Sequence, residues 1–190
     1  MSGAAAKKAT YADLLAAPEG KVAELLDGEL IVSPRPAGRH SVAASALLGQ
    51  LWPSFSLAKA GPSGWVILME PEVHFGEKRR VLVPDLAGWR SSRLSDVGDL
   101  TYFTMVPNWI CEILSPSTQR FDRVQKLAIY SDAGVDHVWL VDPKARTLEV
   151  LERRDKLWTI AATHADQEKV RGVPFETLEI DLSALWGPAP

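Results

Sequence analysis

An apolar run in the middle of the chain is followed by a helical pattern and then by a second apolar run. Residues 106–114 are mostly apolar, which predicts a buried strand. Apolar residues then recur at helical spacing over residues 122–133, and Gly134 follows as a C-cap residue. Residues 137–141 form a second apolar strand that ends at a turn. The pattern predicts a strand–helix–strand unit around which the rest of the chain is organised.

The predicted helix of this unit carries two rows of residues. Its inward face, which we expect to be buried, consists of Val124, Leu127, Ala128 and Ser131. A second row, spaced i, i+4 and i+8, consists of Asp122, Lys126 and Tyr130. We expect this second row to run along the flank of the helix, beside the inward face rather than under it.

Shorter patterns on either side predict further helices and hairpins. Thr10 is placed to cap a helix over residues 11–16, with Asp13 as its capping-box partner. Residues 40–59 have apolar residues at helical spacing, disturbed by Pro53. Residues 173–186 predict a last strand and a docked turn. Three pairs of apolar runs predict β-hairpins: 22–26 with 29–32 around Asp27-Gly28, 65–75 with 80–89, and 147–153 with 157–161.

The composition is that of an ordinary globular chain. With 190 residues, 46% hydrophobic and 24% charged, the chain fits a single domain over 1–190, and no membrane span is indicated. Residues 1–9 lack an apolar stretch after their lysines, so we expect a disordered lead, no signal peptide and a cytoplasmic location. The net charge of −3 argues against a protein that coats nucleic acid through bulk electrostatics. Cys111, the only cysteine, excludes an intramolecular disulfide and a cysteine-cluster metal site.

Two carboxylates are notable for their surroundings. Glu112 lies inside the first apolar run, where an ionised carboxylate is costly to bury unless a cation, a proton or hydrogen-bond donors compensate it. Asp85 follows Pro84 in a strand-like run, and proline within a strand is confined to edges and bulges. On neighbouring strands, two such carboxylates would make an oxygen-rich site suited to Mg²⁺ or Mn²⁺. The alternatives are solvated or ion-paired carboxylates, or the acid pair of a sugar hydrolase.

Several short motifs occur in an order that resembles a known family. Val83-Pro84-Asp85, followed 27 positions later by Glu112-Ile113-Leu114, resembles the PD-(D/E)xK signature of the restriction-endonuclease-like superfamily. More specifically, the chain is similar to the Uma-two family of restriction endonucleases from about Leu25 to the C-terminal strand. The motifs that carry this likeness are ELLDGEL, SPRP, His40, VPDL, WICEILSPST, DRVQK, Tyr130, Gly134-Val135 and VWLVDP.

The resemblance implies a fold and a metal site. The fold is α/β (α+β), with a restriction-endonuclease-like αβββαβ core whose mixed β-sheet is flanked by helices. The metal, Mg²⁺ or Mn²⁺, is held by Asp85 and Glu112. In this superfamily a lysine normally stands two residues after the glutamate, where this chain has Leu114. Lys126, a position at which the family carries a lysine, is the expected substitute.

Four more polar residues are accessory candidates. Glu24 is expected as an inner or outer metal ligand, with an outward-facing strand residue as the alternative. His40 is expected as a phosphate contact or as a support to the metal ligands, with a helix cap or surface residue as the alternative. Asp122 and Tyr130 come from the same helix row as Lys126. For Lys126 itself, the alternative interpretation is a surface ion pair with Asp122, of little energetic value.

The prediction is a divalent-metal-dependent endonuclease that hydrolyses DNA phosphodiester bonds. Asp85 and Glu112 would hold the metal, and Lys126 would orient the attacking water or offset developing negative charge. Paired cuts in duplex DNA would favour a symmetric homodimer. The alternative is a catalytically inactive nucleic-acid-binding or assembly module on the same fold, which Leu114 and the acidic net charge favour.

Overall fold

The computed structural model describes residues 8–56, 64–76 and 80–187. Three predictions lie partly outside these residues: positions 1–7 of the lead, 57–59 of the helix over residues 40–59, and 77–79 of the second hairpin. Within the described residues, Ala9 donates its N–H to the carbonyl oxygen of Gly28 at 2.7 Å. The chain just after position 7 therefore lies against the turn of the first hairpin.

A six-stranded mixed sheet forms the centre of the fold. Its strand order is β10-β9-β8-β7-β6-β3, and every neighbouring pair is antiparallel except β7–β8. Two parallel neighbours require a crossover connection, which the helical segment between β7 and β8 provides. The strands are β3 (Trp65–Met69), β6 (Leu86–Arg90), β7 (Trp109–Ile113), β8 (His137–Asp142), β9 (Thr147–Arg154) and β10 (Leu157–Ala165).

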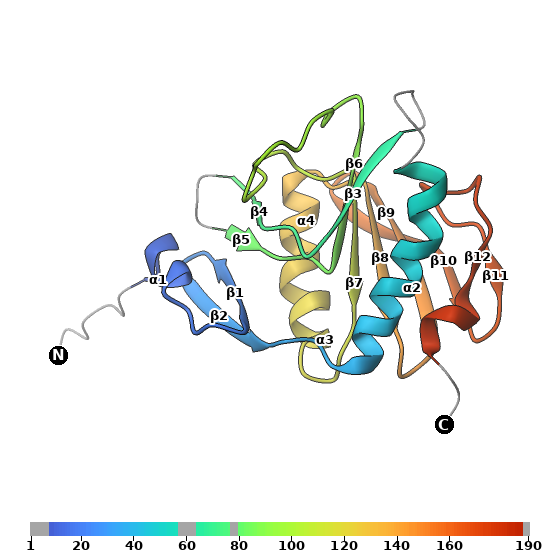
Figure 1. The fold of residues 1–190 in the computed structure, drawn as a ribbon, viewed down its shortest axis with the longest axis horizontal. Helices are drawn as coiled ribbons and strands as arrows, with labels where there is room; N and C mark the ends of the chain where they lie inside the picture. The colour runs from blue at the N-terminus through green and yellow to red at the C-terminus, as the bar shows by residue number, and fades with distance from the viewer. Residues whose placement is uncertain (1–7, 57–63, 77–79, 188–190) are drawn as a thin grey trace.

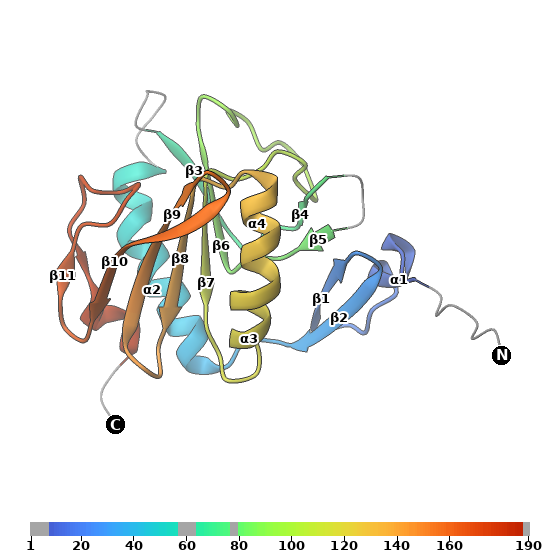
Figure 2. The ribbon, with the colours of Figure 1, turned by 180° about the vertical axis from the view of Figure 1, so that it is seen from behind.

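Helices cover both faces of this sheet, as Figures 1 and 2 show. One face packs against α2 (Gly38–Phe55); the other packs against α3 (Gln119–Phe121), the π-helix η1 (Asp122–Lys126) and α4 (Leu127–Ala133). Successive side chains of a strand point to opposite faces. Trp109, Cys111 and Ile113 therefore belong to the core under α2, and Ile110 to the core under α4.

A smaller, four-stranded sheet lies beyond α4, with α1 (Tyr11–Leu15) at the far left of Figure 1. Its strand order is β2-β1-β5-β4. The predicted hairpin turn is confirmed: Asp27 and Gly28 have φ angles of 49° and 96°, which a two-residue hairpin turn requires. The Thr10–Asp13 capping box is also confirmed. The strands are β1 (Lys21–Leu26), β2 (Glu29–Pro34), β4 (Val73–His74) and β5 (Arg80–Leu82).

The two stretches of the second predicted hairpin pair with each other as expected, but each stretch is broken into two strands that lie in different sheets. β4 pairs with β5 in the smaller sheet, whereas β3 pairs with β6 in the six-stranded sheet. The chain passes between the sheets at Glu70, whose φ is 47°, and again at Pro84, which has no N–H for a ladder. Asp85 therefore lies in a connection immediately before β6 and not inside a strand.

The helix between β7 and β8 buries a different face from the predicted one. Of the predicted inward face, Ser131 is buried and Leu127 packs against the core, but Val124 is 63% exposed and Ala128 is also exposed. By contrast, Asp122, Lys126 and Tyr130 are 3%, 5% and 0% exposed. The row expected along the flank is thus the row that faces inward. A buried lysine is tolerated only if its charge is paired, so this face must carry its own compensating acids.

The remaining elements follow the sequence patterns closely. α2 begins at Gly38, two residues before the predicted start, and Pro53 lies in its last turn. The third hairpin, β9–β10, is confirmed and runs longer than predicted. The C-terminal segment forms β11 (Lys169–Val170), β12 (Ile180–Asp181) and the 3₁₀ helix η2 (Leu182–Trp186) beside α2. Among the described residues, no helix has the length and apolar character needed to cross a membrane.

Candidate active site

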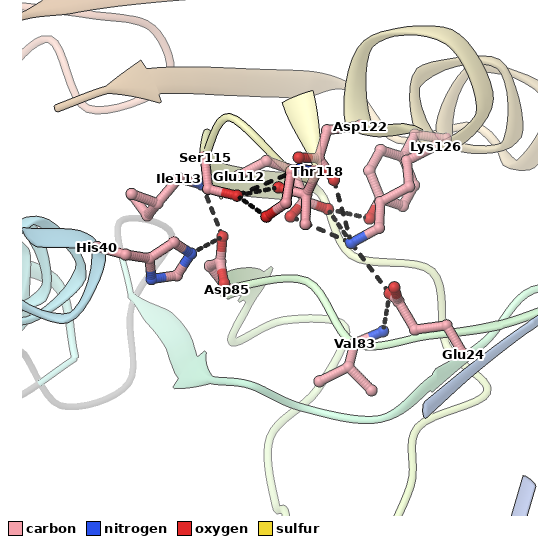
Figure 3. Close-up of polar contacts among 12 residues, drawn as sticks. Glu24, His40, Val83, Asp85, Glu112, Ile113, Ser115, Thr118, Asp122 and Lys126 are labelled. Carbon is pink, nitrogen blue, oxygen red and sulfur yellow. Dashed lines mark hydrogen bonds and ion pairs between the residues drawn. The ribbon is translucent and has the colours of Figure 1, made fainter. Parts of the chain in front are cut away.

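Acidic side chains from distant parts of the chain meet in one cleft of about 160 Å³ near the end of β7. Its walls are β1, the end of β2 with the loop that follows, the start of α2, and the loop between β7 and α3. Figure 3 shows these side chains pointing toward one another. The predicted site residues that line the cleft are Glu24, His40, Asp85, Glu112, Asp122 and Lys126.

Asp85 is fixed by one backbone donor and one imidazole. Its Oδ2 accepts the N–H of Ile113 at 2.7 Å and lies 3.1 Å from Nε2 of His40. The first bond ties Asp85 to β7 at Ile113, the residue after Glu112. The two carboxylates therefore lie close together, at the ends of the neighbouring strands β6 and β7. Burial lowers the pKa of His40, but the hydrogen bond and charge of Asp85 outweigh it, and the pKa lies above its ordinary 6.5.

Glu112 is buried deeper, with 2% of its surface exposed. Its Oε1 accepts a hydrogen bond from the Tyr130 hydroxyl and lies 3.3 Å from Nζ of Lys126. Burial raises the pKa of Glu112 well above 4.5; the Lys126 ammonium opposes this rise, and the neighbouring carboxylates add to it. Tyr130 does not line the cleft but lies behind Glu112, fully buried.

Lys126 places one ammonium among three carboxylates. Its Nζ lies 3.0 Å from Glu24, 3.3 Å from Glu112 and 3.6 Å from Asp122. Burial alone would lower the pKa of Lys126, but the surrounding carboxylates raise it well above 10.5, so the side chain stays charged. The interpretation of Lys126 and Asp122 as a surface pair is therefore wrong: both side chains are buried.

A π-helical turn keeps Asp122, Lys126 and Tyr130 in one row. In an α-helix of 3.6 residues per turn, residues four apart are offset by about 40°, so an i, i+4, i+8 row drifts by about 80°. In η1 the N–H of Leu127 donates to the carbonyl oxygen of Asp122, five residues earlier. The wider turn rotates each residue less, which offsets the drift. The helix thereby directs all three side chains toward the end of β7.

The donor set of the cleft fits a divalent cation. Five carboxylates and two side-chain cations line the cleft, so formal negative charge is in excess: the acids are Glu24, Glu70, Asp85, Glu112 and Asp122, and the cations are Arg35 and Lys126. Carboxylate oxygens are the donors that Mg²⁺ and Mn²⁺ prefer, and Mg²⁺ commonly uses one or two carboxylates with water and phosphate completing its shell. In the described part of the chain, no three His, Cys, Asp or Glu side chains are grouped to hold a metal ion.

Some parts of the cleft were missed by the sequence analysis. The loop after β2 contributes Arg35, which pairs with Glu70 at 3.1 Å near the rim. Ser115 and Thr118, on the loop after β7, also line the cleft. The SPRP and SPST motifs contain all three residues, but a turn-rich sequence does not by itself reveal which cavity its loop borders.

Comparisons with known proteins identify the family and support the fold. Residues 9–183 match the Uma2 family model, which is described as "Putative restriction endonuclease". A search of curated proteins finds no match. Among solved structures, the chain resembles a putative nuclease belonging to DUF820 from Anabaena variabilis ATCC 29413, with a TM-score of 0.74 at 22% identity. The match covers 93% of this chain and 97% of that one. The chain therefore belongs to the Uma2 family of putative restriction endonucleases.

Proposed function

We propose that this protein is a divalent-metal-dependent endonuclease that hydrolyses DNA phosphodiester bonds. The observation that carries the proposal is the meeting of Asp85, Glu112 and Lys126, from three separate segments, in one cleft. Lys126 reaches Glu112 from the helix although Leu114 occupies the usual lysine position and is packed in the core under α4. This arrangement supports the interpretation that Lys126, on the helix, takes the role of the lysine that usually stands on the strand.

Each residue of the cleft would have its own role in phosphodiester hydrolysis. Asp85 and Glu112 would hold the metal, which when bound lowers the pKa of a water molecule and neutralises charge on the phosphate. The ammonium of Lys126 offsets negative charge that develops on the phosphate oxygens. His40 holds Asp85 in place through Nε2. For cuts in both strands of a duplex, two copies of the chain would act as a symmetric dimer.

Metal binding is the first property to test. Calorimetric titration of Mn²⁺ into the wild type, Asp85→Asn and Glu112→Gln, with and without a non-cleavable DNA duplex, should show binding that both substitutions abolish. Asp132→Asn, the same change on an exposed carboxylate of α4, is the matched control and should bind normally. A folded wild type that binds no Mn²⁺ even with DNA present would contradict the proposal and favour the inactive binding module.

Cleavage is the second property to test. Wild-type protein with Mg²⁺ should cut DNA, chelator should stop the cutting, and Glu112→Gln should lack activity while its circular dichroism spectrum stays unchanged. Cleavage that survives in Glu112→Gln would show that the chemistry occurs elsewhere.

A further inference from the structure

Glu24 is bound by two donors that belong to different parts of the active site. It lies on β1, and 4% of the residue is exposed. Its Oε1 accepts the backbone N–H of Val83 at 2.9 Å and lies 3.0 Å from Nζ of Lys126. Figure 3 shows the side chain reaching from β1 to both partners. One oxygen therefore links the segment that leads into Asp85 with the catalytic ammonium.

The contacts of Glu24 differ from those expected of a metal ligand. Its Oε1 is already engaged by two donors, the Val83 N–H and the Lys126 ammonium. Its contact with Lys126 is the shortest of the three that the ammonium makes with carboxylates. It also accepts the backbone N–H of Val83, two residues before Asp85, and so fixes the position of the chain that carries Asp85.

We propose that Glu24 is a positioning residue for Lys126 and not a metal ligand; this inference rests on the proposed function. The carboxylate holds the ammonium at a set place relative to Asp85. If Glu112 were to hold a metal ion, Lys126 would still have Glu24 and Asp122 as partners. The ammonium of Lys126 would then stay charged and keep its position in the cleft.

The test is Mn²⁺ calorimetry on the full chain. Glu24→Gln keeps an acceptor for the Val83 N–H but removes the charge that holds Lys126, whereas Asp85→Asn removes a proposed metal ligand. Glu24→Gln should weaken Mn²⁺ binding far less than Asp85→Asn does. In DNA cleavage it should lower kcat about 10- to 100-fold, the usual effect of removing a group that orients a catalytic residue, with little change in KM.

A second pair of variants separates positioning from ligation. In a Lys126→Met background the Glu24→Gln change should have almost no further effect on Mn²⁺ affinity, because the residue through which it acts is gone. If Lys126→Met does not fold, the comparison of Glu24→Gln with Asp85→Asn decides alone. Glu70→Gln, on a carboxylate at the rim of the same cleft, is the control for loss of one negative charge.

The outcomes distinguish this inference from the proposed function. Absence of Mn²⁺ binding by the wild type would overturn the proposed function and this inference with it. Wild-type binding that Glu24→Gln abolishes as completely as Asp85→Asn would overturn only the positioning role and make Glu24 a ligand. Wild-type binding that survives Glu24→Gln, with reduced kcat, is the expected result.

Discussion

At the scale of single residues, the burial of Glu112 depends on two donors from one helix. The Lys126 ammonium compensates its charge, and the Tyr130 hydroxyl supplies a hydrogen bond from behind the cleft. A buried carboxylate that loses one donor keeps its desolvation cost and has less to offset it. Residues that never touch a substrate can therefore decide whether Glu112 is held in a usable orientation.

Tyr130→Phe tests this dependence directly. The substitution removes the hydroxyl donor to Glu112 but keeps the ring, which packs 5.5 Å from Phe75 between centroids. We expect a loss of about 1–3 kcal/mol in the free energy of unfolding, measured with urea. Tyr102→Phe, at a residue 43% exposed, is the control and should cost much less. Equal losses in the two variants would show that the Glu112 contact contributes little.

At the scale of elements, the π-helical turn is the least expected part of the site. The sequence places Asp122, Lys126 and Tyr130 in a row, but a regular α-helix would let that row drift away from β7. The single wide turn over Asp122–Lys126 corrects the drift at the point where Lys126 is attached. Such turns often occur at functional sites, because they re-aim side chains without ending a helix.

Deleting Val124 should convert this turn to a regular α-helix. Val124 is 63% exposed, so its own side chain contributes little. After the deletion Asp122 and Lys126 become an i, i+3 pair, which still shares one helix face, so we expect the ion pair to survive and the free energy of unfolding to fall by about 0.5–3 kcal/mol. Helix content by circular dichroism should remain. The control Val124→Ala should change stability by no more than about 0.5 kcal/mol; a larger change there would assign the effect to the side chain.

At the scale of the whole molecule, the core under α2 has an aromatic centre of Trp109, Trp139 and Phe175, and none of these rings lines the candidate cleft. Gly172 lies against the aromatic core under α2: a Cβ there would come within 2.9 Å of Trp139 and 3.3 Å of Val150. Gly49 lies on the exposed side of α2, and a Cβ added there would meet no atom within 4 Å outside the helix's own backbone. The two glycines therefore test packing away from the candidate cleft, which neither of them lines.

Substitution of each glycine by alanine should have opposite effects. Gly172→Ala should lower the free energy of unfolding by about 1–3 kcal/mol through overpacking. Gly49→Ala should raise it by about 0.5–1 kcal/mol, because alanine favours the helix. Neither change should alter the dissociation constant of Mn²⁺ in calorimetry. A weakened Mn²⁺ affinity in Gly172→Ala would show that the aromatic core supports the site.

Sequence patterns predicted local structure well and long-range burial less well. The Asp27-Gly28 turn, the Thr10 cap and the Gly134 C-cap depend on a few adjacent residues, and all three are confirmed. The inward face of the helix after β7 was mispredicted because hydrophobic periodicity treats a charged row as exposed. Lys126 is buried only because acids from β1 and β7 meet it, and no local pattern reports that meeting.

The ammonium of Lys126 also bears on how the protein responds to changing metal supply. A cluster of buried acids that relied on Mg²⁺ for neutralisation would make folding depend on the ion, as it does in small zinc domains. Here the ammonium of Lys126 neutralises part of the charge of Glu24, Glu112 and Asp122 without a metal ion. If the proposed metal site is correct, removal of the metal would stop the activity and leave the protein folded, and return of the metal would restore the activity.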